Sequence, residues 1–349
     1  MAIGIMNHFP VSLFLMLQVI TEETENVSRC PTAKDFFREV RKSVYLCSMI
    51  TPLSILIPTF NRECVELVRT LSQQGASIKD LCFEIVVLDD CSTDSRVKAT
   101  NRAILQIPHC RLLELEANVG RTRIRNLLAQ EAQYPTLLYL DSDVQIVHSD
   151  FIARYLEYAQ DDVVCGGVCI RPSDVLAGKN LRYCYEMSCL QKFDVAHRQK
   201  HPYQGFRTTN FMVRREVMLA YPFNERIRRY GYEDVFWGKT LKAAHIGIFH
   251  IDNSVAVDDF EPNDVFLKKT DEGLRTLLPI ADELSGYSLV VDYASMLARW
   301  HVAGLLRFLY RQVKPILMAN LLGHTPSVVF YNVYRLGEFL LLQHKENRA

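Results

Sequence analysis

Two aspartates separated by a single residue follow an apolar stretch in the middle of the chain. Residues 137–140, Leu-Leu-Tyr-Leu, run directly into Asp141-Ser-Asp143. The apolar residues are typical of a buried strand, and ligands of open parallel sheets collect beyond the carboxyl ends of the strands. Two carboxylates there can share Mg²⁺ or Mn²⁺, which favour oxygen ligands and often keep substrate phosphates as further ligands. Asp and Ser are also ordinary turn residues, so this short motif leaves both interpretations open.

Two further acidic pairs occur at comparable places. Asp89 and Asp90 follow an apolar run, and Glu233 and Asp234 open a segment with helical periodicity. Carboxylates are usually solvated surface groups, so each pair has an ordinary structural explanation. Three such pairs, at strand ends or at a helix start, favour a shared site.

The elements that would position these acids alternate along the chain. Strands are expected at 53–57, 83–88, 111–115 and 137–140, with helices at 62–74, 95–106 and 121–132 between them. This order predicts a parallel sheet with crossover helices. The strands are short and apolar rather than alternating, as a sheet covered on both faces requires. Beyond them, we expect strands at 163–170, 208–213 and 246–251, helices at 151–160, 175–190, 230–244 and 262–278, and substrate-facing loops within 172–206.

Composition excludes several classes of protein. Forty basic and forty acidic residues balance in a chain of 349, so no overall electrostatic footprint for nucleic acid exists. The ten cysteines form no C-x-x-C pair, which argues against a zinc ribbon or a redox dithiol. The apolar run Phe9–Ile20 is too short to span a membrane and lacks the basic flank of a signal peptide. We therefore expect a reduced, cytoplasmic protein.

The C-terminal part, from about residue 280, is helical and apolar. No acidic residue occurs between Tyr293 and Gly337. In this part, one side of a predicted helix carries Arg299, Arg307, Arg311 and Lys314, and the other carries Val302, Leu305, Leu309 and Val313. Such a helix can lie in a membrane interface, or pack on the core with a solvated basic face. Residues 293–315 are thus a candidate peripheral membrane contact, and Pro315 is expected to break the helix.

Five motifs in order resemble those of family 2 glycosyltransferases. They are LSILIPTFN (53–61), VVLDDCSTD (86–94), NVGRTRIRN (118–126), LYLDSDV (138–144) and GYED (231–234). The resemblance covers roughly residues 50 to 275. It implies the α/β GT-A (Rossmann-like) fold, with a mostly parallel central sheet flanked by helices and here a C-terminal helical extension. The expected parts are an N-terminal, partly helical extension (1–50), the GT-A domain (51–278) and the amphipathic extension (279–349).

The same resemblance implies a function. It is inverting transfer of a sugar from a nucleotide-diphosphate donor, with a divalent metal (Mn or Mg), to a hydroxyl of a glycan or lipid-linked acceptor. Surface polysaccharide biosynthesis at the inner face of the membrane is the setting it suggests.

Donor-binding roles follow by resemblance. Pro58 and Thr59 would border the nucleotide, and Asp90 would accept hydrogen bonds from its base or ribose. Arg121 and Arg125, four residues apart on one helical face, could meet the base or the diphosphate. Exposed surface arginines are the alternative. Asp89 fits a loop cap better than a ligand.

The resemblance also assigns the reacting groups. Asp141 would touch the ribose or a metal-bound water, and Asp143 would bind the metal. Asp234 would be the general base that deprotonates the acceptor, and Glu233 would orient it. Alternatively, Glu233 and Asp234 are ordinary acids in the first turn of a helix, where they interact favourably with the helix dipole.

One departure concerns the metal. Many family members have a histidine after the last strand as a further ligand, and Val257 stands there instead. His250 or Asp258 could substitute, and Asp258 is the better candidate because a carboxylate suits Mg²⁺.

Two rival functions stay open. A sugar nucleotidyltransferase also needs paired acids and a metal, but it would want a Gly-rich basic loop where Thr59-Phe-Asn-Arg62 stands. A degenerate, inactive nucleotide-binding scaffold is the other.

Overall fold

The computed structural model describes residues 51–346. The expected N-terminal extension, residues 1–50, and the run Phe9–Ile20 within it lie outside the described residues. The described part belongs to a single unit, Ile50–Ala349. A division at residue 278, just after the last helix of the expected GT-A domain, therefore stays a proposal.

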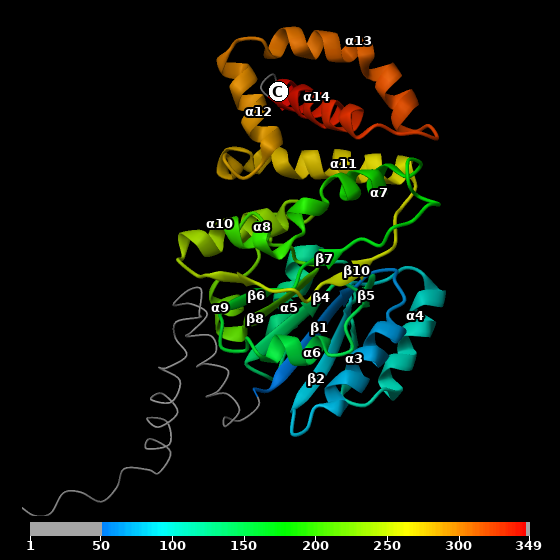
Figure 1. Cartoon of the computed structure of the whole chain (residues 1–349), viewed down its shortest axis with the longest axis vertical. Coiled ribbons are helices and arrows are strands. Elements are labelled where there is room, and N and C mark those ends of the chain that lie inside the picture. Colours follow the sequence, from blue (N-terminus) through cyan, green and yellow to red (C-terminus); the bar gives the residue numbers. More distant parts are fainter. Residues whose placement is uncertain (1–50, 347–349) are drawn as a thin grey trace, which may run out of the picture. The chain divides into compact units, whose positions relative to one another are not determined.

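A mostly parallel sheet forms the centre of the described residues (Figure 1). Across residues 51–346 it has seven strands in the order β3-β2-β1-β4-β8-β6-β9. Neighbouring strands are parallel except at β8, which is antiparallel to both β4 and β6. The strands are β1 (Leu53–Thr59), β2 (Phe83–Asp89), β3 (Cys110–Glu114), β4 (Thr136–Leu140), β6 (Val163–Cys165), β8 (Asn210–Arg214) and β9 (Ile248–His250). The expected α/β fold class is confirmed.

Helices on both faces explain the unbroken apolar runs of the strands. Successive side chains of a strand point to opposite faces. In β1, Ile55 belongs to the same core cluster as Val68 of α3 (Val65–Ser77). The next residue, Leu56, belongs to the cluster of Leu128 of α5 (Arg121–Glu131). Both faces of β1 are therefore dry.

The expected strand 163–170 is wrong as a single element. It divides into β6 and β7 (Val168–Cys169), and β7 joins β10 (Val255–Val257) and β5 (Val144–Ile146) in a small second sheet. Gly166 and Gly167 separate the two strands. A Cβ on Gly166 would lie 2.5 Å from the carbonyl oxygen of Asn253, and Gly167 has φ +85°. The chain turns here because only glycine permits that approach and that φ.

Most of the remaining helices of the α/β part follow the expected order with shifted ends, but a helix at Val195–Lys200 lies where only loops were expected. The helix expected from 175 begins only at Leu181, where the Asn180 side chain caps it by accepting from the Tyr183 N–H. These helices are α4 (Ser95–Asn101), α6 (Phe151–Leu156), α7 (Leu181–Ser188), α8 (Val195–Lys200), α9 (Arg215–Ala220), α10 (Glu233–Ala243) and α11 (Asn263–Leu277), with the short 3₁₀ segment η2 (Arg102–Gln106) after α4.

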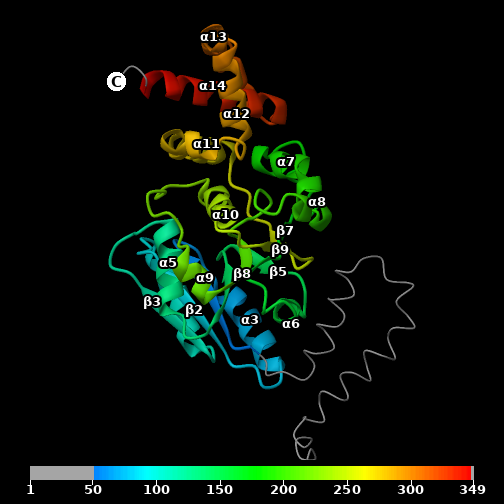
Figure 2. The same cartoon turned by 90° about the vertical axis from the view of Figure 1, so that its left-hand side faces the viewer.

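Three further helices make up the C-terminal extension. They are α12 (Leu289–Arg299), α13 (Ala303–Leu321) and α14 (Val328–Glu346), and α11 lies between them and the sheet (Figures 1 and 2). The break expected at Pro315 is wrong, because α13 continues through it. Tyr310 and Leu317 are buried on either side of the exposed proline, so packing offsets the missing N–H bond. No helix within 51–346 is long and apolar enough to cross a bilayer.

Candidate active site

The carboxyl ends of parallel strands bring the first predicted residues together. Thr59 at the end of β1 pairs in register with Asp89 at the end of β2. The Asp90 N–H donates to the Thr59 carbonyl at 2.9 Å. Pro58 precedes Thr59 within β1, and the Thr59 hydroxyl donates to the Arg62 carbonyl. Pro58, Thr59 and Asp90 thus occupy one edge of the sheet.

Asp90 organises the turn that leads into α5. Its two carboxylate oxygens accept from the Val119 N–H at 2.7 Å and the Gly120 N–H at 3.0 Å. Gly120 has φ +86°, and a Cβ there would lie 2.7 Å from the carbonyl oxygen of Arg228. Asp89 instead accepts from the Ser92 N–H and hydroxyl, the expected loop cap.

A buried arginine connects two of the acidic pairs. Arg125 is 2% exposed, and its Nη2 donates to Asp141 Oδ1 at 2.6 Å. Its Nη1 lies 3.9 Å from Glu233 Oε1 and donates to the Arg121 carbonyl. Both terminal nitrogens therefore contact protein groups and fix Asp141 and Glu233 relative to each other, whereas the buried Nε has no hydrogen-bond partner within the part of the chain that the structure describes. Arg121, one turn earlier, is exposed and lies 5.0 Å from the centre of the Tyr230 ring.

Asp143 sits where several arginines converge. Desolvation raises the pKa of its carboxyl, and the neighbouring Asp141 charge raises it further. Arg62, Arg121 and Arg182 act in the opposite direction. The sequence alone does not point to Arg62 or Arg182, because neither residue belongs to the five family motifs quoted above. Arg182 belongs to α7, inside the segment where only loops and one helix could be expected.

The segment after β10 is held by ion pairs to these arginines. Arg62 pairs with Asp259, and Arg182 pairs with Glu261. Lys269 of α11 lies 3.0 Å from the same Glu261. These contacts place residues 259–261 beside two of the arginines that act on Asp143.

The candidates for a third metal ligand are engaged elsewhere. Asp258 accepts from Arg171 at 2.9 Å. His250 is buried between Arg198 and the Pro202 carbonyl, and burial lowers its pKa to about 4. Among the described residues, no three His, Cys, Asp or Glu side chains are grouped as a metal set. Asp143 with Asp141 still fits a cation that is shared with substrate phosphates, as Mg²⁺ commonly is.

Glu233 and Asp234 begin α10 after a turn with left-handed residues. Gly231 has φ +96° and Tyr232 has φ +68°, which is unusual for an aromatic residue. Glu233 is buried. Burial raises the pKa of Asp234 to about 6, the Glu233 charge adds to this, and Arg207 opposes it. A carboxylate with a pKa in that range can take up a proton near neutral pH.

Helix α7 links the surroundings of Glu233 and Asp234 to the C-terminal helices. Its Glu186 lies 3.9 Å from Arg207. The Tyr185 hydroxyl accepts from Arg335 of α14 at 3.2 Å. Arg335 also interacts electrostatically with Tyr232, directly before Glu233. No local pattern in the sequence could indicate this contact, since 103 residues separate Tyr232 from Arg335.

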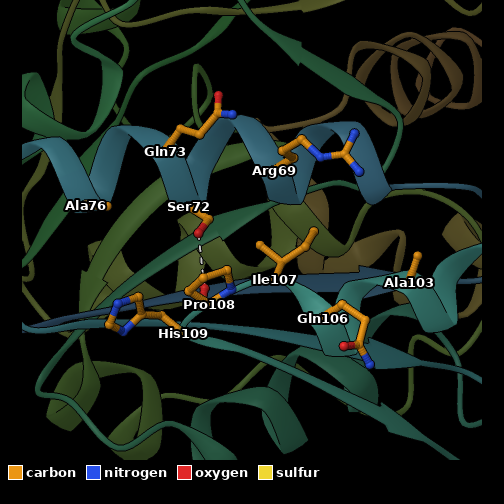
Figure 3. Close-up of a pocket in the computed structure, with 9 residues that line it drawn as sticks. All are labelled: Arg69, Ser72, Gln73, Ala76, Ala103, Gln106, Ile107, Pro108 and His109. Carbon is orange, nitrogen blue, oxygen red and sulfur yellow. Dashed lines mark hydrogen bonds between the residues drawn. The ribbon is translucent and has the colours of Figure 1, made fainter.

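A hollow of about 530 Å³ lies elsewhere, between α3 and the segment 103–109 (Figure 3). Ser72 donates to the Pro108 carbonyl across its floor. None of the acidic pairs lines this hollow, so its lining offers no group for the chemistry predicted above. Its lining residues are Arg69, Ser72, Gln73, Ala76, Ala103, Gln106, Ile107, Pro108 and His109.

Comparison with known proteins agrees with the motifs. Residues 54–221 match the family model "Glycosyl transferase family 2". Over 93 residues, or 26% of this chain, 32% are identical to the poly(ribitol-phosphate) beta-N-acetylglucosaminyltransferase TarS of Staphylococcus aureus. Over 102 residues, or 29% of the chain, 32% are identical to an uncharacterized glycosyltransferase of Haemophilus influenzae.

These matches are partial. The aligned segments span 16% of TarS and 38% of the Haemophilus protein, less than two thirds of either. Among solved structures, S. aureus TarS 1–349 with UDP aligns over 85% of this chain and 91% of its own, with a TM-score of 0.43 and 15% identity.

Proposed function

We propose that this chain, a glycosyltransferase whose residues 54–221 form a family 2 domain, transfers a sugar with inversion from a nucleotide-diphosphate donor to an acceptor hydroxyl. The observation that carries the proposal is the Arg125 bridge. It holds Asp141 next to Glu233, which directly precedes Asp234, the residue whose pKa burial raises to about 6. One buried cation thereby ties the donor-side acid to the acceptor-side pair.

The donor would lie along the carboxyl edge of β1, β2 and β4. Pro58 and Thr59 would border its nucleotide, and Asp90 would meet the base or ribose with the lone pairs left after capping Val119 and Gly120. Arg121, which is exposed, would meet the diphosphate. Arg125 would act by holding Asp141 against the ribose rather than by contact with the donor.

Asp234 would act as the general base, with Glu233 keeping the start of α10 in place. The Asp234 carboxylate takes the proton of the acceptor hydroxyl, and the acceptor oxygen bonds to the anomeric carbon of the donor sugar. The bond from that carbon to the diphosphate breaks on the opposite face, and the electron pair leaves with the nucleoside diphosphate. One displacement of this kind inverts the anomeric configuration.

A divalent metal, Mn²⁺ or Mg²⁺, would be held by Asp143, with Asp141 beside it and the donor phosphates as the remaining ligands. When bound, it would neutralise the diphosphate leaving group. Asp258 remains a proposed ligand only if it leaves Arg171. The arginines around Asp143 would share the same electrostatic task.

The acceptor would be a glycan or lipid-linked surface polymer. The name of TarS describes sugar transfer to poly(ribitol phosphate). The similarity to TarS supports a role of this chain in cell-wall or surface polymer synthesis. Arg207, whose charge acts on Asp234, is a cation on the acceptor side. We place the protein in the cytoplasm, with residues 293–315 in contact with the inner face of the membrane.

The test is Asp234→Asn with thermal shifts and transfer assays. UDP, GDP, CDP, TDP and their sugars are offered with Mn²⁺, Mg²⁺ or chelator, since a ligand that binds the folded state raises its stability. We expect one nucleotide to give a metal-dependent shift in both proteins, and transfer only by the unchanged chain. Transfer by the Asn variant would refute the base assignment. No shift and no transfer from folded protein would favour an inactive scaffold.

A further inference from the structure

The outer side of α13 carries large apolar side chains that face solvent. Leu305, Phe308 and Ile316 are 60%, 59% and 66% exposed, and Leu309 and Val313 are 47% and 41% exposed. At 3.6 residues per turn these five fall on one side of the helix. We call them the outer α13 face. Contiguous exposed apolar patches on monomers commonly mark interaction sites.

This face is additional to the side by which α13 packs. Tyr310, Leu317 and Leu321 are buried, in the same core cluster as Tyr331 and Tyr334 of α14. The sequence leaves open whether Leu305, Leu309 and Val313 pack on the core, and the structure contradicts that alternative. The helix is therefore anchored by one side and offers a second, apolar side.

Positive charge borders the outer α13 face. No acidic residue occurs between Tyr293 and Gly337. Arg311 is exposed one turn after Phe308, and Arg299 is exposed just before the helix. Lys314, by contrast, is paired with Glu338 of α14. The flanks of the face can therefore attract anions but offer no partner to cations.

We infer that the outer α13 face lies in the interface of a bilayer containing anionic lipids. This deepens the proposed function, on which it rests, by naming the membrane partner and the residues that meet it. The apolar side chains would enter the boundary between headgroups and acyl chains. Arg299 and Arg311 would bind lipid phosphates, and Trp300, 66% exposed at the start of the face, suits the interfacial layer.

A second copy of the chain fits the same face less well. In a two-fold contact each face would meet itself. Arg299 and Arg311 of each copy would then border a face that carries the same positive charge, with no acid in 293–337 to pair with either. Like charges opposed across an interface weaken it. An anionic lipid surface satisfies both the apolar residues and the arginines.

The test is flotation of the full-length chain with vesicles, which needs no catalysis. Phosphatidylcholine vesicles are compared with the same vesicles containing phosphatidylglycerol. We expect binding only to the anionic vesicles, weakened by salt because exposed charges are screened. Leu305→Gln, Phe308→Gln and Ile316→Gln together should lower the partition coefficient by at least about tenfold. Arg299→Gln with Arg311→Gln should remove the preference for phosphatidylglycerol.

Matched controls separate this inference from the proposed function. Leu105→Gln with Leu219→Gln changes exposed apolar residues outside the face, 56% and 44% exposed, and should leave flotation unchanged. Nucleotide thermal shifts in lipid-free buffer should be the same in every variant. Failure of a folded wild-type chain to float with either vesicle would overturn the inference. So would dimerisation in lipid-free solution that the triple variant abolishes, which would assign the face to a second copy.

Discussion

Arg125 Nη2 lies 2.6 Å from Asp141 Oδ1, and the same buried guanidinium lies 3.9 Å from Glu233 Oε1. Asp141 follows β4, and Glu233 opens α10, 92 residues later in the chain. The Arg125 side chain therefore sets the position of Asp141 relative to Glu233. Both acids are themselves partly or wholly buried, so their charges depend on this partner.

Arg125→Met should therefore damage both stability and transfer. Removing one partner of a buried ion pair leaves an uncompensated charge and costs about 3–5 kcal/mol of unfolding free energy. Arg125→Lys keeps the charge, but an ammonium cannot reach two carboxylates as the planar fork does. We expect the Lys variant to fold and to lose most of its kcat, measured by denaturant unfolding and steady-state transfer.

Arg123→Met is the control for the two Arg125 variants. Arg123 is exposed on the same helix and lies 4.0 Å from Glu225. Its removal should change stability by less than about 1 kcal/mol. Equal losses in the Arg123 and Arg125 variants would contradict the bridging role.

Asp234 should make stability and activity respond to pH in opposite ways. Its folded pKa is raised to about 6 from an ordinary 3.8, so the folded state holds the proton more tightly. The ionised carboxylate thus destabilises the fold, and that penalty grows as pH rises from about 4 to 6. Asp234→Asn should raise the unfolding free energy at pH 7 by about 1–3 kcal/mol, with no gain near pH 4.

Transfer by the unchanged chain should fall below about pH 6, because a protonated Asp234 cannot accept the acceptor's proton. Asp264→Asn is the control for stability, since a hydrogen bond from Lys268 lowers the pKa of this exposed residue. That variant should not be stabilised at pH 7. A pH–rate profile that stays flat through pH 6 would argue against Asp234 as the base.

Arg335→Lys should impair catalysis although Arg335 belongs to α14 of the C-terminal extension. Arg335 donates to Tyr185 at 3.2 Å and interacts electrostatically with Tyr232, whose φ of +68° is unfavourable and must be held by its surroundings. A lysine keeps the charge but not the two-sided contact. We expect kcat to fall by about tenfold or more, with little change in the nucleotide thermal shift. Arg275→Lys, at an exposed position of α11, should act like the unchanged chain. A loss confined to the melting temperature would reduce Arg335 to a packing role.

Gly120→Ala should destabilise the donor edge. The glycine has φ +86°, and a Cβ would lie 2.7 Å from the Arg228 carbonyl oxygen, a backbone atom. We expect a loss of about 1–3 kcal/mol and a weaker nucleotide shift, since Asp90 bonds the Gly120 N–H. Gly247→Ala, with no atom within 4 Å of its Cβ and no positive φ, should be nearly neutral. Nucleotide binding unchanged in the Gly120 variant would separate this turn from the donor site.

The sequence predicted the elements better than the contacts between them. Apolar runs indicated β1, β2 and β4 because both faces of these strands are buried. The division of 163–170 depends on a close approach to Asn253, which no local pattern encodes. The continuation of α13 through Pro315 depends on packing against α14 in the same way.

The candidate site divides along the same line. The acids that follow strands are predictable, because strand ends of a parallel sheet meet at one edge. Arg62 and Arg182 act on Asp143, and Arg335 donates to Tyr185, through tertiary contacts that none of the motifs indicates. Asp258, predicted as a metal ligand from its position after β10, is paired with Arg171, a residue 87 positions earlier. Its role as a ligand stays a prediction.

The strand order has a consequence for synthesis on the ribosome. Strands β3, β2, β1 and β4 are contiguous in the chain, so this half of the sheet can assemble once residue 140 has emerged. The free edge of β4 must then wait for β8 at residues 210–214, and β6, although made earlier, also needs β8. An unpaired, fully apolar edge is a template for association with other chains. The nascent protein is therefore most exposed to misassembly between the emergence of residue 140 and the emergence of residue 214.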